Sequence, residues 1–274
     1  MIAFYVLGGG LGHLTRVKTF IQNKGITSPF KIITSNPKWR LFFSEKELIY
    51  IPAYKNISSQ ALRDMIYEAC ASYSFESLYI DTFPCGILGE LDITTIKHKK
   101  CFYLARRMQW QKYEALTTKV LPFEISYCFE PLSKDHQSFI LSNSKGHQAF
   151  QLSYPKPQPQ RAKAFALPLH HPLWLIVHST HQEELEVLIH QAKDIAAIQK
   201  CSPHFLVLSD VRLSLASNFT LLTGENPIDW YPLAEKIFSA AGFNTWYQLS
   251  PWREKHCCIP FKRNYDDQFW RSVQ

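Results

Sequence analysis

The sequence lacks any apolar run near the roughly 20 residues that a membrane-spanning helix requires. Its most apolar stretch, 164–177, is interrupted by two prolines and two histidines. The first seven residues carry no basic lead-in and run into glycines, so they are too short for the apolar core of a signal peptide. We therefore expect a globular protein without a membrane span that acts in the cytoplasm.

The sequence also lacks any Cys-x-x-Cys pair, although it contains seven cysteines. An odd number without paired spacing fits neither a disulfide framework nor a zinc ribbon. We interpret these side chains as reduced thiols, most of them buried. We assign no metal site and no cofactor.

Acidic residues are scarce in the first part of the chain. Residues 1–168 contain 21 lysines and arginines against 12 aspartates and glutamates, whereas residues 169–274 contain 9 against 11. The two parts therefore carry charges of +9 and −2. Such an asymmetry indicates an anionic partner for the first part.

Short apolar runs alternate with helical patterns, which is typical of a parallel sheet covered by helices. Three prolines within 155–159 favour an extended connector. The fold prediction is therefore α/β, with Rossmann-like domains at 1–154 and 169–274 and a Pro-rich linker at 155–168. The expected strands are 3–7, 30–34, 48–51, 77–81, 101–105, 124–129, 173–177, 204–208, 218–222, 237–241 and 256–259, and the expected helices begin at His13 or span 61–72, 109–120 and 181–197.

Glycine is infrequent, with ten residues in the chain, yet four of them lie within 8–12. A glycine turn between a strand and a helix points free amide groups and the positive end of the helix dipole at one place, which suits a phosphate or another anion. A dinucleotide fingerprint would need glycine where His13 stands, and no Gly-Lys-Ser/Thr of a Walker loop occurs. A merely tight turn is the alternative to an anion site.

His13 directly follows the last glycine of this cluster. The helix dipole weakens the affinity of a first-turn histidine for a proton, so such a side chain tends to stay a neutral base. That property suits a general base. A structural hydrogen-bonding role is the alternative for a lone histidine.

The second half repeats the strand, glycine and helix pattern at 237–248. Gly242 and the capping side chains of Asn244 and Thr245 begin the expected helix, which again gives an anion-binding terminus. A polar cluster at 263–268 can offer hydrogen bonds to a polyhydroxylated ligand, or its acidic pair can be a solvated helix start. Two such termini facing each other across a cleft would bind a diphosphate.

Taken together, these motifs resemble the two-domain GT-B glycosyltransferases. The resemblance is to the branch of the peptidoglycan N-acetylglucosaminyltransferase and of uncharacterised bacterial predicted glycosyltransferases. The loop 8–13 is similar to the family's Gly-Gly-x-Gly-His loop, 241–245 to its Ala-Gly-Tyr-Asn-Thr/Ser motif and 266–268 to its Asp-Gln motif. The segment 81–91 also looks like part of the uncharacterised branch.

The resemblance implies an inverting, metal-independent hexosyltransferase-like enzyme with a cleft between its two domains. The first domain would take a saccharide, lipid-linked or other anionic acceptor, and the second a UDP- or dTDP-sugar donor. The charge asymmetry, in turn, indicates an attraction of the first part to an anionic glycan or, peripherally, to the inner face of an anionic membrane. The implied roles are catalysis for His13, contact with the donor diphosphate for Gly9, Gly10, Gly12, Ser179, Gly242, Asn244 and Thr245, and contact with the donor sugar for Asp267 and Gln268.

Two departures from the family pattern concern the nucleotide. Gln248 stands where the family has a glutamate that holds the ribose hydroxyls, and an amide lacks the charge that strengthens this contact. The residues at 250–253 replace the usual small-residue and glycine stretch. Both changes bear on which nucleotide is preferred.

Two alternatives to a transferase stay open. Nucleotide-sugar epimerases and hydrolases share the GT-B architecture, and only product analysis separates them from transferases. A nucleic-acid-binding module would use a basic and aromatic patch instead, although the patch leaves both glycine turns unexplained and no nucleic acid is expected as a partner. The patch would consist of Arg106, Arg107, Trp110, Lys112 and Tyr113.

Overall fold

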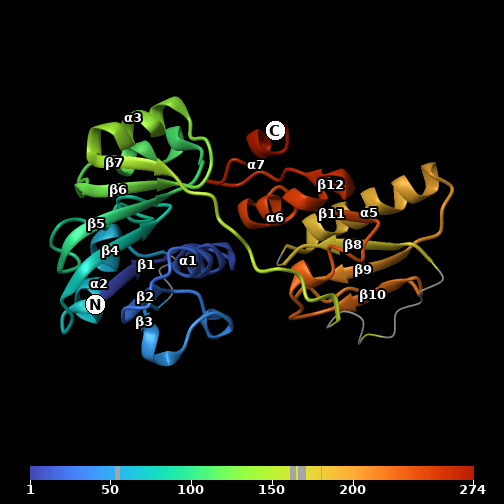
Figure 1. Cartoon of the computed structure of the whole chain (residues 1–274), viewed down its shortest axis with the longest axis horizontal. Coiled ribbons are helices and arrows are strands. Elements are labelled where there is room, and N and C mark those ends of the chain that lie inside the picture. Colours follow the sequence, from blue (N-terminus) through green and yellow to red (C-terminus); the bar gives the residue numbers. More distant parts are fainter. Residues whose placement is uncertain (53–55, 161–164, 166–170, 180) are drawn as a thin grey trace. The chain divides into compact units, whose positions relative to one another are not determined.

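The computed structural model describes residues 1–52, 56–160, 165, 171–179 and 181–274 (Figure 1). Part of the predicted linker, 161–164 and 166–168, lies outside the described residues. By its internal contacts the chain divides into two compact units. Unit 1 comprises Met1–Ser153 with Asn264–Asp267, and unit 2 comprises Tyr154–Arg263 with Gln268–Gln274.

Unit 1 is built on a seven-stranded sheet in the order β3-β2-β1-β4-β5-β6-β7, and all its strand pairs are parallel. Helices connect several of these strands, as a parallel sheet requires. The strands are β1 (Ile2–Tyr5), β2 (Phe30–Thr34), β3 (Leu48–Tyr50), β4 (Phe75–Asp81), β5 (His98–Ala105), β6 (Phe123–Cys128) and β7 (Ser144–Ala149), and the helices are α1 (Gly12–Asn23), α2 (Ser59–Cys70) and α3 (Lys134–Asn143).

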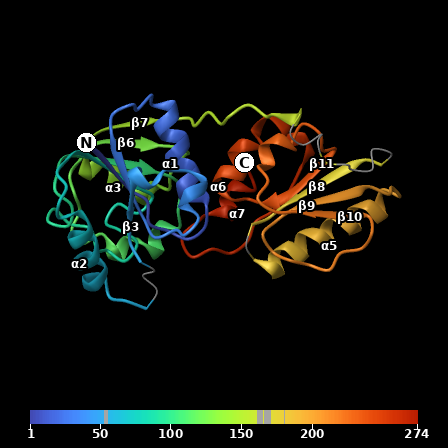
Figure 2. The same ribbon diagram turned by 90° about the horizontal axis from the view of Figure 1, so that it is seen from below.

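Unit 2 has a five-stranded parallel sheet in the order β10-β9-β8-β11-β12. Its long helix α5 runs along one face of this sheet (Figures 1 and 2). The strands are β8 (Leu173–Val177), β9 (His204–Leu208), β10 (Phe219–Leu222), β11 (Lys236–Ala240) and β12 (His256–Ile259), and the helices are α5 (Gln182–Ile198), α6 (Phe243–Gln248) and α7 (Gln268–Arg271).

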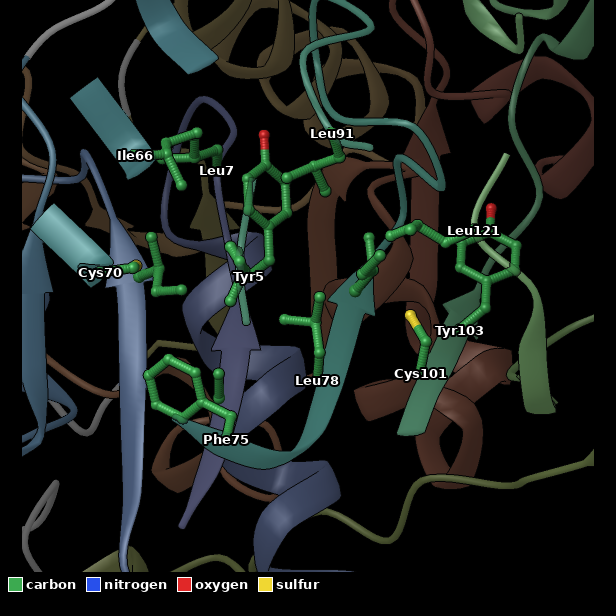
Figure 3. Packing of buried hydrophobic residues seen from close by; sticks show 14 of the residues in the cluster. Tyr5, Leu7, Ile66, Cys70, Phe75, Leu78, Leu91, Cys101, Tyr103 and Leu121 are labelled. Carbon is green, nitrogen blue, oxygen red and sulfur yellow. The ribbon is translucent and has the colours of Figure 1, made fainter. Parts of the chain in front are cut away.

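The core of unit 1 follows from the alternation of side chains along each strand. Figure 3 shows one face of the sheet, where Tyr5, Leu78 and Cys101 lie on adjacent strands, and Ile66 and Cys70 of α2 belong to the same hydrophobic cluster. Burying one such large apolar side chain contributes about 1.5–3 kcal/mol. Because the faces of the sheet are covered by apolar side chains, polar side chains gather at the ends of the strands, where the loops lie.

In each sheet, the first three strands of the chain are added one after another toward one edge. The next strand then lies on the other side of the first strand, and the remaining strands follow toward the opposite edge. In unit 1 this switch falls between β1 and β4, and in unit 2 between β8 and β11. Ligands of open α/β sheets bind at the carboxyl ends of the strands beside such a switch point. The glycine loop 8–12 follows β1, and Gly242 follows β11, so both predicted anion sites lie at a switch point.

The predicted α/β class and parallel sheets are confirmed, but one helix prediction is wrong. Residues 109–120 form two short 3-10 helices, Trp110–Lys112 and Glu114–Leu116, instead of an α-helix. Trp110, Tyr113 and Leu116 repeat every three residues, and in a 3-10 helix such residues lie one above the other. This allows them to pack in one aromatic cluster with Phe83.

Helix α3 and strand β7 were not predicted. The strand reads Ser-Lys-Gly-His-Gln-Ala, is largely exposed and lies at the edge of its sheet, so it has no apolar alternation to identify it. No helix among the described residues is long and apolar enough to cross a membrane. All seven cysteines are free thiols.

Candidate active site

His13 and Asp81 form a buried pair at the switch point of unit 1. His13 lies in the first turn of α1, and Asp81 is the last residue of β4, the strand beside β1. Nδ1 of His13 is 2.6 Å from Oδ2 of Asp81, and the two residues are 8% and 0% exposed. An ionised carboxylate only accepts hydrogen bonds, so Nδ1 carries the proton. The lone pair of the neutral ring is therefore on Nε2.

Arg16 holds the other side of this carboxylate. Its Nε donates to Oδ1 of Asp81 at 2.7 Å and its Nη2 donates to Oδ2 at 2.6 Å, while Arg16 is only 2% exposed. Arg16 follows His13 by three residues, so both side chains leave the same face of α1. A buried carboxylate without such a partner would cost several kcal/mol.

The charges around His13 decide which form of the ring is stable. Burial lowers the pKa of His13 most; the hydrogen bond and charge of Asp81 raise it, and the charges of Arg16 and Arg106 lower it further. The net result is a pKa below the ordinary value, which keeps the ring neutral at neutral pH. Burial raises the pKa of Asp81, but the charge of Arg16 and the hydrogen bonds from His13 and Arg16 hold it well below its usual range.

The absence of a side chain at Gly8 makes room for the imidazole ring of His13. A Cβ at Gly8 would collide with Nε2, whereas Gly9 and Gly10 have open space where a side chain would be. Gly10 has a φ of +74°, and its carbonyl accepts a hydrogen bond of 2.7 Å from Asn36 Nδ2. The loop is therefore held in place while its backbone stays accessible to a ligand.

The segment 81–91 continues from Asp81 into a loop that buried hydrogen bonds hold in place. Thr82 has a φ of +67°, its hydroxyl accepts from Arg16 at 2.6 Å and its carbonyl accepts from the hydroxyl of Tyr103 at 2.7 Å. Buried Glu90 accepts hydrogen bonds from the Tyr5 hydroxyl and from the amide of Leu88. These contacts fix the end of β4 and therefore the direction of the Asp81 carboxylate.

Asn264–Asp267, here called the returning segment, belongs to unit 1 although its sequence neighbours belong to unit 2. Asp266 pairs with Arg106, and Asp267 accepts from Nε of Arg107 at 2.8 Å. The carbonyl of Tyr265 accepts from the amide of Gln109 at 2.8 Å. Asp267, predicted to contact the donor sugar, is thus engaged in an ion pair of unit 1.

The basic and aromatic patch considered from the sequence does not form a continuous surface. Arg106, Trp110 and Tyr113 are buried. Only Lys112 is exposed, and Arg107 is partly covered. Its aromatic members, Trp110 and Tyr113, pack against Phe83.

The predicted diphosphate residues of unit 2 lie at its own switch point. Ser179 is exposed after β8, and Gly242 is the N-cap of α6 after β11, the strand beside β8. No atom would contact a Cβ built at Gly242. Asn244 Oδ1 accepts from the hydroxyl of Tyr154 at 3.1 Å, and Thr245 is half-buried. The backbone at this turn is open on the side where a ligand would approach.

Two glutamines that were predicted to bind the donor have partners within unit 2. Oε1 of Gln248 lies 3.5 Å from the hydroxyl of Tyr231. Gln268 is 3% exposed, and its Oε1 accepts from the amide of Phe261 at 3.0 Å. Gln268 therefore stabilises the loop after β12 in this structure.

The sequence does not predict three residues that support these turns: Asp81 as the partner of His13, Arg16, and Arg271. Arg271 is fully buried and donates to the carbonyl of Ala241 at 2.6 Å, directly before the Gly242 turn. Asp81 carried a usable signal, because it ends a predicted strand, and carboxyl ends of parallel strands share one edge. Within the described ranges, no three histidine, cysteine, aspartate or glutamate side chains are grouped to hold a metal ion.

No protein-family model matches the sequence, and the search of curated proteins gives no match. Solved structures do match. The glycosyltransferase SnogD from Streptomyces nogalater is 12% identical with a TM-score of 0.53, and the match covers 95% of this chain and 82% of that one. Arabidopsis thaliana UGT89C1, complexed with quercetin, is 11% identical with a TM-score of 0.59 over 99% and 81% of the two chains.

A further match has a different activity. UDP-N-acetylglucosamine 2-epimerase from Rickettsia bellii is 10% identical with a TM-score of 0.59, covering 92% of this chain and 76% of that one. At such identities the likeness concerns the fold, which glycosyltransferases and an epimerase of a nucleotide sugar share. The chain therefore has the two-domain GT-B fold.

Proposed function

We propose that the protein is an inverting glycosyltransferase that moves a sugar from a UDP- or dTDP-sugar to an acceptor hydroxyl. The observation that carries this proposal is the His13–Asp81 pair beside the glycine loop, with Nδ1 and Oδ2 2.6 Å apart. A neutral imidazole oriented by a carboxylate is suited to accept a proton from a hydroxyl. The GT-B fold supports the nucleotide-sugar part of the proposal.

The reaction follows from the protonation state of His13. Nε2 accepts the acceptor's proton while the acceptor oxygen bonds to the anomeric carbon of the donor. The bond from that carbon to the diphosphate oxygen breaks at the same time, and the nucleotide diphosphate leaves. One displacement from the opposite side inverts the anomeric configuration. Asp81 holds the ring in the tautomer with a free Nε2 and stabilises the imidazolium that forms.

The donor is proposed to bind through backbone and small polar groups. Gly9 and Gly10 contribute exposed backbone beside His13, and Gly12 begins α1. Ser179, Asn244 and Thr245 contribute side chains around the open Gly242 turn, and Gln248 contributes an amide to the ribose. The assignment of Asp267 and Gln268 to the donor sugar stays a prediction.

The acceptor is proposed to be a saccharide, lipid-linked or otherwise anionic, that binds unit 1. Unit 1 contains 18 lysines and arginines against 14 aspartates and glutamates, and its net charge of +4 supports an anionic partner. Peripheral binding to an anionic inner membrane face, with action in the cytoplasm, is part of this proposal. Each lysine or arginine near such a surface adds about 1 kcal/mol at low salt. Sedimentation with anionic but not with neutral vesicles is expected, and equal sedimentation with both would contradict it.

The transferase proposal is tested with a panel of UDP- and dTDP-sugars. Calorimetry is expected to show binding of UDP or dTDP, because the open backbone at the Gly242 turn of unit 2 suits a diphosphate. NMR of the product is expected to show inverted anomeric configuration. No binding of any nucleoside diphosphate at millimolar concentration would contradict the proposal.

A second candidate function is epimerisation or hydrolysis of a nucleotide sugar, supported by the likeness to the Rickettsia bellii epimerase. The same panel distinguishes it. An epimerase converts the nucleotide sugar into an isomer with the nucleotide still attached. A hydrolase releases free sugar without any acceptor.

A further inference from the structure

We propose that Arg16 is a positioning residue for the His13 base, because its fork fixes Asp81 and compensates the charge of that carboxylate. Asp81 can then orient the imidazole without making it strongly basic. This inference rests on the proposed function in assigning His13 as the base.

The geometry of the carboxylate carries the proposal. Oδ1 of Asp81 is bound by Nε of Arg16, and Oδ2 is shared by Nη2 of Arg16 and Nδ1 of His13. Two parallel bonds from a planar guanidinium set both the position and the plane of a carboxylate, which a lysine cannot do. The Arg16 fork therefore decides where Oδ2 meets the imidazole.

A second anchor fixes the guanidinium itself. Nη2 of Arg16 also donates to the hydroxyl of Thr82 at 2.6 Å. The carbonyl of Thr82 in turn accepts from the hydroxyl of Tyr103, whose oxygen is 3.0 Å from Nε2 of His136. These residues are all buried, so the fork has no room to rotate away from Asp81.

The contact between Arg16 and His13 acts against a charged ring. Nη2 lies 3.1 Å from Nδ1, and both nitrogens carry hydrogens because Nδ1 already donates to Asp81. A guanidinium at this distance disfavours the imidazolium, while Asp81 favours it. Charged groups that act on the ring include Asp81 from β4, Arg16 from α1 and Arg106 after β5, which is itself paired with Asp266.

The opposed effects of Asp81 and Arg16 on the protonation of His13 bear on its proposed role as a base. Asp81 favours the protonated ring, whereas burial and, to a smaller extent, the charge of Arg16 favour the neutral ring that can take a proton from an acceptor. With Arg16 in place, the carboxylate orients the ring and the base stays free. Arg16, one helical turn after His13, thus lets Asp81 orient the ring without strongly raising its pKa.

The first test uses the unaltered protein and does not depend on any substrate. Nitrogen-15 NMR of labelled histidines is expected to show His13 with the proton on Nδ1 and a titration midpoint below the ordinary value of about 6.5. Assignment uses the signal that disappears in His13→Ala. A midpoint above 7, or a proton on Nε2, would overturn the proposal.

The second test compares two substitutions of Arg16. Arg16→Gln is expected to raise the His13 midpoint by about one pH unit or more, because Asp81 is then uncompensated. The acidic limb of the pH dependence of kcat/KM should move upward by the same amount. Arg16→Lys keeps the charge without the fork, so the midpoint should move less while kcat falls at least about tenfold.

A structural role alone predicts a different pattern. In that case Arg16→Lys would be less stable yet show the wild-type midpoint, tautomer and kcat, which would overturn the proposal. Lys18→Gln removes a positive charge from the same helix outside the site and should leave the His13 midpoint unchanged. If Arg16→Gln does not fold, the proposal is tested by the His13 midpoint of the wild type and by the midpoint and kcat of Arg16→Lys. Failure of the glycosyltransferase proposal would remove the kcat readout but not the titrations.

Discussion

The two switch points of this protein differ in how their side chains are arranged, although both belong to parallel sheets. In unit 1, three buried side chains, His13, Asp81 and Arg16, hold one another within hydrogen-bonding distance. In unit 2, the corresponding turn offers open backbone at Gly242, and nearby side chains only flank it. A base must be held in one orientation and one protonation state, so it needs a charged network. An anion site needs accessible amide groups, so it needs space.

Removing the proposed base, His13, is expected to have the largest effect on activity. His13→Ala should lower kcat by about 100- to 10,000-fold, because a general base contributes that much. Binding of the nucleotide diphosphate to unit 2 should be unchanged by calorimetry. His147→Ala, an exposed histidine on edge strand β7, is the matched control and should keep full activity. Normal turnover by His13→Ala would mean that the base lies elsewhere.

Removing the carboxylate tests whether unit 1 depends on its buried charges for stability. Asp81→Asn should lower the free energy of unfolding by about 3–5 kcal/mol, because it leaves Arg16 buried without a counter-charge. Urea unfolding measures this loss. Glu76→Gln, from an exposed ion pair with Lys99, should leave it nearly unchanged. Equal effects of the two substitutions would contradict the buried network.

The lowered pKa of Asp81 also predicts how the free energy of unfolding changes at acidic pH. The pKa of Asp81 is lower in the folded state than in the unfolded chain, so its stabilising contribution is complete above about pH 4. That contribution is lost as the pH falls toward the folded pKa. Asp81→Asn should therefore lose less stability between pH 5 and about pH 2 than the wild type does.

Replacing one glycine by alanine in each turn compares the turn after β1 with the turn after β11. Gly8→Ala places a Cβ against Nε2 of His13 and should lower kcat roughly 10- to 100-fold by displacing the ring. Gly242→Ala meets no atom, so the protein should fold normally while diphosphate binding weakens. Melting temperature, kcat and calorimetric Kd separate the two outcomes. Unchanged binding by Gly242→Ala would remove that turn from the donor site.

The smallest expected effect concerns the returning segment. Asp267→Asn and Arg107→Gln should each cost about 1 kcal/mol or less in unfolding free energy, because the pair is partly exposed. If Asp267 also binds the donor sugar, only Asp267→Asn should raise the KM for the donor. Equal kinetics in the two variants would leave Asp267 as a partner of Arg107 alone.

The sequence by itself determined the α/β class, most strands and the position of both glycine turns. These features are local, because periodicity and a glycine cluster act over a few residues. The sequence did not predict 3-10 geometry at 109–120 or edge strand β7, where contacts within the folded unit outweigh weak local preferences.

Only the tertiary structure decided which residues surround His13. Asp81 is 68 positions away and reaches His13 because β1 and β4 are neighbours in the sheet. The partner of Asp267 is 160 positions away, so no spacing rule could have paired it with Arg107. Hydrogen-bonding capacity can be read from a residue type, but the partner and the resulting pKa depend on burial and on charges that only folding brings together.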